Sequence, residues 1–142
     1  FTTGANPVSC EAALATLEMI EEEQLLEASL EKGDYVRQTM DRWITDYECI
    51  GDVRGKGLSI GIDIVSDPIQ KTRDPEAALK ICNYCFDKGV VIIAVAGNVL
   101  RFQPPLVISY DQLDYALSTL EKAIQALNRG DLDQYEIEGQ GW

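Results

Sequence analysis

Apolar residues recur at helical spacing in four stretches of the chain, and this periodicity predicts four helices. The first begins at Asn6-Pro7, because asparagine caps a helix N-terminus and proline fits its first turn; the acidic run Glu21-Glu22-Glu23 interrupts it. The second helix follows at once, and Gly33 within it favours a kink or a break. Its expected apolar face consists of Leu26, Leu30, Val36, Met40, Trp43 and Tyr47.

The other two helices have start and stop signals. Asp74-Pro75-Glu76 begins the third, and Gly89 closes it. Ser109 and Gln112 have the spacing of a capping box at the start of the fourth, and Gly130 ends it. The apolar positions of this last helix are Leu113, Leu117, Leu120, Ile124 and Leu127.

Three apolar runs between these helices predict strands. The first alternates apolar with small or polar residues from Leu58 to Ile64, after a turn marked by Gly55 and Gly57. Val90–Val95 is continuously apolar and predicts a central strand, and Val99–Phe102 forms the next one. The order of elements predicts an α+β fold, with a small antiparallel sheet of about three to four strands covered by helices.

The length of 142 residues fits one domain, which we expect to span residues 1–128, followed by an acidic tail over residues 129–142. The net charge of −12 argues strongly against nucleic acid and anionic membrane surfaces as partners, because their phosphates would repel the protein. No apolar run is long enough to span a membrane, and Phe1-Thr2-Thr3-Gly4 lacks the features of a signal peptide. We therefore expect a cytoplasmic protein with reduced cysteines. The first residue is not Met, which suggests that the chain was cut from a longer protein.

Arg101 is the residue that points most directly to a function. If Leu100 and Phe102 face the core, Arg101 faces the opposite side of the sheet, since successive strand side chains alternate. A guanidinium among apolar residues needs an anionic partner. Two interpretations are open: an ion pair with a nearby carboxylate, or a clamp for a substrate carboxylate, which the guanidinium fork matches with two hydrogen bonds.

Other candidate chemistry is weaker. Cys82-Asn83-Tyr84-Cys85 has the spacing of a redox or zinc motif, but it lies inside the third helix on its apolar face, where core packing is favoured. The chain has no histidine, and we expect no metal site. Thr2 and Thr3 precede the first helix, where hydroxyl and backbone N–H groups suit a phosphate. The sequence contains no recognisable pair of nucleophile and base.

Three segments, in this order, resemble the C-terminal small domain of class III pyridoxal-phosphate-dependent aminotransferases, most closely the 4-aminobutyrate and ornithine types. Thr2–Pro7 resembles the family's entry into a long helix between domains, Asp52–Leu58 its Val-Arg-Gly-x-Gly-Leu turn into a strand, and Gly97–Leu106 its Asn-x-Arg-Phe-x-Pro-Pro-Leu strand. The similarity extends to about Ala126.

The resemblance implies roles for individual residues. Thr2, with Thr3 beside it, would contact the phosphate of pyridoxal 5'-phosphate across a dimer interface. Arg101 would bind the α-carboxylate of an amino or keto acid, and Arg54 would have a structural role. The implied reaction transfers an amino group from an ω-amino acid or amine, with 4-aminobutyrate as the favoured donor, to 2-oxoglutarate.

The resemblance also implies that part of the enzyme lies elsewhere. The lysine that forms the Schiff base would precede Phe1, so the chain alone is expected to be inactive, and its partners would be the missing large domain and a second subunit. One alternative is a free-standing α+β module that holds a small carboxylate ligand, or closes a protein interface, through Arg101. Another is a redox or zinc module built on Cys82 and Cys85.

Overall fold

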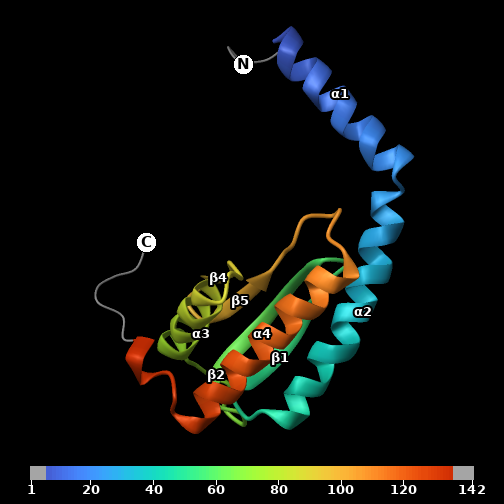
Figure 1. Cartoon of the computed structure of the whole chain (residues 1–142). Coiled ribbons are helices and arrows are strands. Elements are labelled where there is room, and N and C mark those ends of the chain that lie inside the picture. Colours follow the sequence, from blue (N-terminus) through green and yellow to red (C-terminus); the bar gives the residue numbers. More distant parts are fainter. Residues whose placement is uncertain (1–5, 136–142) are drawn as a thin grey trace.

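The computed structural model describes residues 6–135, which form an antiparallel sheet covered by helices on one face (Figure 1). The helices are α1 (Pro7–Glu22), α2 (Leu25–Asp46), α3 (Pro75–Asp87) and α4 (Tyr110–Arg129). The strands are β1 (Ile50–Lys56), β2 (Ser59–Asp67), β3 (Thr72–Arg73), β4 (Ile93–Val95) and β5 (Val99–Phe102). The predicted α+β class is confirmed.

Within residues 6–135 the sheet has five strands, with the order β1-β2-β5-β4 and the short β3 beside β2. All neighbouring strands are antiparallel. The sequence pattern missed β1, in which the glycines at 51 and 55 weaken the strand signal, and β3, which has only two residues. The core lies between the sheet and helices α2, α3 and α4, and its largest fully buried side chains include Met40, Trp43, Ile60, Ile62, Ile64, Ile81, Leu100, Leu113, Leu120 and Ile124.

The prediction of a central strand over Val90–Val95 is wrong. Only Ile93–Val95 is a strand, and it lies at the edge of the sheet because β5 occupies the position next to β2. Val91 is 76% exposed and Ile93 is also exposed, whereas Ile92 is buried, so the continuous apolar run does not reflect burial at every position. The prediction for β5 is confirmed, since Leu100 and Phe102 are buried and Arg101 is exposed on the opposite face.

Helix α2 differs from the prediction at its N-terminal half. Leu26 and Leu30 are exposed, whereas Leu25, Gly33, Val36, Met40 and Trp43 are buried. The helix passes through Gly33 without a break. A Cβ at Gly33 would lie 2.4 Å from the carbonyl of Gly57, so the glycine allows α2 to pack directly on the turn between β1 and β2. The actual break comes earlier, at Gln24, whose φ of 51° separates α1 from α2.

The predicted helix caps are confirmed. Asn6 caps α1, Asp74 caps α3, and Ser109 and Gln112 form the capping box of α4. Gly130 ends α4 with a φ of 75°. Beyond α4 the chain turns back onto α3 through a short 3-10 helix (Asp133–Tyr135), and Leu132 is buried.

Helix α1 projects away from the rest of the described structure (Figure 1). None of its residues is buried. Its exposed large apolar side chains are Val8, Leu14, Leu17 and Met19. Within the part of the chain that the structure describes, none of the helices has the length and apolar character needed to cross a bilayer.

Candidate functional site

The face of the sheet opposite the helices brings two arginines into one row. Arg54 on β1 lies opposite Gly61 on β2, Gly61 lies opposite Arg101 on β5, and Arg101 lies opposite Ile93 on β4. Gly61 places no side chain between the two arginines, and a Cβ there would lie 3.1 Å from Val99 Cγ1. The neighbouring row contains Asp52, Asp63, Val99 and Val95.

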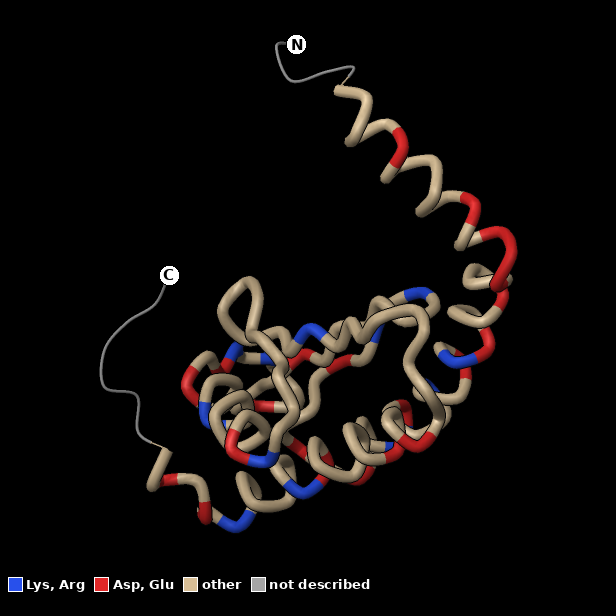
Figure 2. The backbone as a smooth tube through the Cα atoms, turned by 45° about the horizontal axis from the view of Figure 1, so that its top comes forward, with Lys and Arg blue, Asp and Glu red and all other residues tan. Residues whose placement is uncertain are grey.

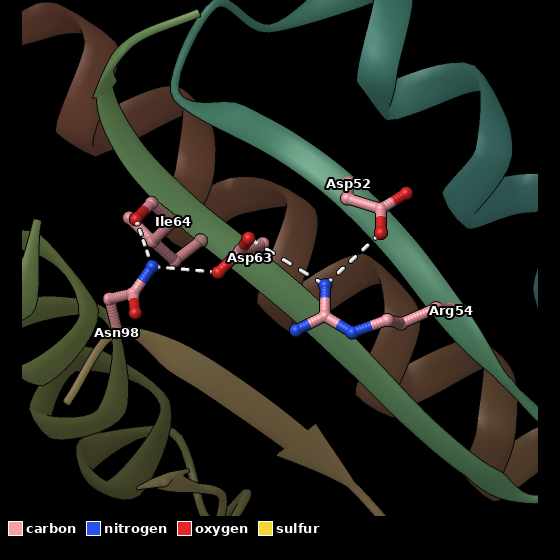
Figure 3. Close-up of polar contacts among 5 residues, drawn as sticks. All are labelled: Asp52, Arg54, Asp63, Ile64 and Asn98. Atoms are coloured by element: carbon pink, nitrogen blue, oxygen red, sulfur yellow. Dashed lines mark hydrogen bonds and ion pairs between the residues drawn. The ribbon is translucent and has the colours of Figure 1, made fainter. Parts of the chain in front are cut away.

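Arg54 belongs to a network of polar contacts with two aspartates (Figure 3). Its Nη1 lies 3.1 Å from a carboxylate oxygen of Asp52 and 3.6 Å from one of Asp63. Asn98, which is 1% exposed, donates from Nδ2 to Asp63 Oδ1 at 2.7 Å and to the carbonyl of Ile64 at 2.8 Å. Asp63 therefore has two partners that hold it, one from β1 and one from the segment that leads into β5.

Arg101, unlike Arg54, has no carboxylate partner among the described residues. None of the ion pairs within 4.0 Å among residues 6–135 includes Arg101. Its guanidinium donates instead to the side-chain carbonyl of Gln103, two residues along the same face. Acidic residues are plentiful on the helices and at the junction of α1 and α2 (Figure 2), but none of those described neutralises Arg101. The alternative of an ion pair with a local carboxylate is thus not found in the described structure.

A groove of about 800 Å³ lies beside Arg101, between the β4–β5 edge of the sheet and the first half of α4. Its lining is mainly apolar and includes Val91, Ile93, Phe102, Pro104, Ile108 and Tyr115. The charged residues of the lining are Arg101 and Asp111. An uncompensated guanidinium at the edge of an apolar groove suits a small molecule that carries one carboxylate.

The same lining does not suit the reactive end of pyridoxal phosphate. That cofactor needs a lysine for its Schiff base, and among residues 6–135 the groove lining contains no lysine. The predicted phosphate contacts Thr2 and Thr3 lie outside the described residues.

The cysteine motif lies in the core. Cys82 and Cys85 are buried on α3, and burial raises the pKa of the Cys82 thiol to about 11. Burial, together with the neighbouring Cys82, raises the pKa of the Cys85 thiol to about 12. A reactive thiol pair needs lowered pKa values, so this motif has a packing role. Over residues 6–135 there is no group of three or more side chains able to hold a metal ion.

Sequence reasoning missed Asp63 and Asn98 as parts of this site. Asp63 occupies a polar position of the alternating β2 pattern, which shows its face but not its partners. Asn98 is buried, and its Oδ1 has no hydrogen-bond partner among the described residues. Their contact joins residues 35 positions apart in the sequence, so no local signal marks it.

The chain belongs to the class III aminotransferases, since the model of that family matches residues 1–124. The family prediction is confirmed, and pyridoxal phosphate is the cofactor of the protein that contains this chain. An amine transaminase from an uncultivated Pseudomonas species, solved in its PLP-bound internal aldimine form, is 32% identical with a TM-score of 0.79. The match covers 84% of this chain and 27% of that one.

Several curated relatives with different activities are similar to this chain. Isoleucine 2-epimerase of Lentilactobacillus buchneri is 48% identical over 100% of this chain and 32% of its own length. Leucine/methionine racemase of Thermococcus litoralis is 43% identical over 92% of this chain and 29% of its own length. Probable 4-aminobutyrate aminotransferase of Bacillus subtilis is 38% identical over 88% of this chain and 29% of its own length. The chain therefore spans less than a third of these relatives, and 4-aminobutyrate as the amine donor stays a prediction.

Proposed function

We propose that this chain supplies the carboxylate-binding residue of a pyridoxal-phosphate-dependent enzyme that acts on amino acids. The observation that carries the proposal is the exposed guanidinium of Arg101, which lacks a carboxylate partner among residues 6–135 and lies beside an apolar groove. In this role Arg101 binds and orients the substrate through its carboxylate, with two parallel hydrogen bonds. The cofactor, when bound, withdraws electrons from the substrate's α-carbon.

The first candidate reaction is transamination. In it the amino group of the donor, for which 4-aminobutyrate is the predicted compound, passes to 2-oxoglutarate to give glutamate and the donor's carbonyl product. The family and the 38% identity to the probable 4-aminobutyrate aminotransferase support this candidate. Arg101 would bind the α-carboxylate of 2-oxoglutarate in the second half of the reaction.

The second candidate is inversion at the α-carbon of an amino acid. The 48% and 43% identities to an isoleucine 2-epimerase and a leucine/methionine racemase favour it. In this reaction a proton leaves the α-carbon and another returns on the opposite face, with no net oxidation or reduction. Arg101 has the same task in both reactions, which is to hold the carboxylate while the bonds to the α-carbon change.

One experiment separates these candidates. The full-length protein is incubated with L-isoleucine, L-leucine or 4-aminobutyrate, each with and without 2-oxoglutarate, and the products are separated by chiral chromatography. Glutamate that forms only with 2-oxoglutarate indicates a transaminase. D-leucine or D-allo-isoleucine that forms without any keto acid indicates a racemase or epimerase. If Arg101→Ala leaves both activities unchanged, the proposed role of Arg101 is wrong.

The partners follow from helix α1, whose large apolar side chains Val8, Leu14, Leu17 and Met19 are exposed. Such a helix needs a protein surface to cover it. This supports the proposal that the large domain and a second subunit of the same enzyme pack here, with Thr2 and Thr3 reaching the cofactor phosphate.

The four cysteines Cys10, Cys49, Cys82 and Cys85 are free. Free thiols support a reducing compartment, and hence the proposed cytoplasmic location.

A further inference from the structure

The position of Asp63 between two arginines is the basis of a further inference. In the register of the sheet, Asp63 pairs directly with Asp52 on β1 and with Val99 on β5. Arg54 and Arg101 are therefore its diagonal neighbours, one on each side. Diagonal neighbours lie about 7–8 Å apart, within reach of a long side chain. The Asp63 carboxylate is thus within reach of either guanidinium, and of the two it forms an ion pair with Arg54.

The structure shows which arginine Asp63 contacts. Arg54 lies 3.6 Å from Asp63 Oδ2, and Asn98 donates to Asp63 Oδ1 at 2.7 Å, so each carboxylate oxygen has its own partner (Figure 3). Asn98 is itself fixed, because its Nδ2 also donates to the Ile64 carbonyl and its backbone carbonyl accepts from the Ile64 N–H at 3.0 Å. The carboxylate is held from two directions, while Arg101 remains without a carboxylate among the described residues.

We propose that Arg54 and Asn98 hold the Asp63 carboxylate away from Arg101, and so keep Arg101 available for the substrate carboxylate. The inference rests on the proposed function of Arg101. Arg54, Asn98 and Asp63 are positioning residues in it, because they act through Arg101. Arg54 also separates Asp63 from Asp52, which lie directly opposite each other and would repel.

Removal of Arg54 has a definite consequence under this proposal. Asp63 loses its ion pair on the β1 side, is repelled by Asp52, and turns to the free guanidinium on its other side. Arg101 is then masked by an internal carboxylate that competes with the substrate. A purely structural role for the network predicts a different result, since loss of stability would weaken all ligands alike.

The test measures binding to the full-length protein loaded with pyridoxal phosphate, followed by the absorbance change of the cofactor. The two probes are L-leucine and 3-methylbutylamine, which is leucine without its carboxylate. The variants are Arg54→Ala, Asp63→Asn and the double variant Arg54→Ala/Asp63→Asn. Arg37→Ala is the matched control, because it removes another arginine, which is partly exposed, from a carboxylate pair at 3.1 Å on α2.

We expect Arg54→Ala to weaken L-leucine binding about two- to fivefold, the range of a partly exposed ion pair. Binding of 3-methylbutylamine should not change. The double variant should restore L-leucine binding, because the amide introduced by Asp63→Asn carries no charge to mask Arg101. Arg37→Ala should behave as the unmodified protein. Unchanged L-leucine binding in Arg54→Ala, or an equal loss for both probes that Asp63→Asn does not restore, would overturn the inference.

Arg101→Ala separates this inference from the proposed function. If Arg101→Ala leaves the preference for L-leucine over 3-methylbutylamine unchanged, the carboxylate-binding role of Arg101 is wrong. If Arg101→Ala removes the preference but Arg54→Ala does not reduce it, the role of Arg101 stands and only the positioning role of Arg54 fails.

Discussion

Arg54 and Arg101 lie on the same open face of the sheet, on either side of Gly61, yet only Arg54 is paired with carboxylates among the described residues. Asp52 and Asp63 neutralise Arg54, whereas Arg101 donates to the uncharged side chain of Gln103. Two arginines on the same face thus have different partners. Arg54 joins the strands, and Arg101 presents a positive charge at the edge of the groove.

Replacement of Arg101 by alanine should remove the charge-assisted pair with the substrate carboxylate. Such a pair contributes about 1.5–3 kcal/mol, so we expect a loss of roughly tenfold to hundredfold in kcat/KM for carboxylate substrates. Arg101→Lys should recover part of this loss, because it keeps the charge but not the planar fork. Steady-state kinetics with 2-oxoglutarate or an L-amino acid measures the effect, and unchanged constants in Arg101→Ala would contradict it.

Gln103→Glu provides the converse change. A glutamate at this position would place a permanent carboxylate next to the Arg101 guanidinium, where the glutamine carbonyl now accepts a hydrogen bond. The pair would be exposed, so we expect KM for carboxylate substrates to rise about two- to fivefold with kcat little changed. Gln103→Ala is the control and should leave KM near its original value. A KM that rises equally in both variants would show that the glutamine itself orients Arg101.

The orientation of Arg101 was predictable because it depends on local alternation. Leu100 and Phe102 define the buried face of β5, and a strand places the intervening residue on the other face. The caps of α1, α3 and α4 were predictable for the same reason, since each depends on a few adjacent residues.

The partners of the site were not predictable from the sequence. Asp63 and Asn98 meet only because β2 and β5 pair. That Asp63 forms its ion pair with Arg54 and not with Arg101 depends on side-chain positions across three strands. The position of β4 at the edge of the sheet was also not predictable from the sequence. Its apolar run predicted burial, but the strand order, which a local pattern does not contain, leaves Val91 and Ile93 exposed in the described structure.

Gly33→Ala should destabilise the protein, although alanine is the better helix former by about 1 kcal/mol. The added Cβ would lie 2.4 Å from the backbone of Gly57, and backbone atoms of a turn cannot yield as the end of a side chain does. We expect a net loss of about 1–3 kcal/mol in the free energy of unfolding. Chemical denaturation measures it, with the exposed Asp34→Ala on the same helix as control. A gain in stability would mean that α2 and the β1–β2 turn are farther apart than the structure shows.

The buried thiols of α3 should make stability depend on pH in the alkaline range. Burial raises the pKa of Cys82 to about 11 and that of Cys85 to about 12, whereas an unfolded thiol has a pKa of about 8.5. At pH values well below about 8.5, both states keep their protons and the folded state has its full stability. Above that, the unfolded state loses protons first, so the free energy of unfolding falls as pH rises toward about 11. The slope for each thiol is at most about 1.4 kcal/mol per pH unit.

Urea denaturation at about pH 8 and about pH 10, on either side of the unfolded thiol pKa, tests this dependence. The variant Cys82→Ala/Cys85→Ala should lose less stability between the two pH values than the unmodified protein. The two proteins differ only in these thiols, so all other titratable groups are common to both. Cys10→Ala is the matched control, since Cys10 is exposed on α1, and it should lose as much as the unmodified protein. An identical loss in all three proteins would show that the thiols of α3 reach solvent, and would make Cys82 and Cys85 candidates for a reactive pair again.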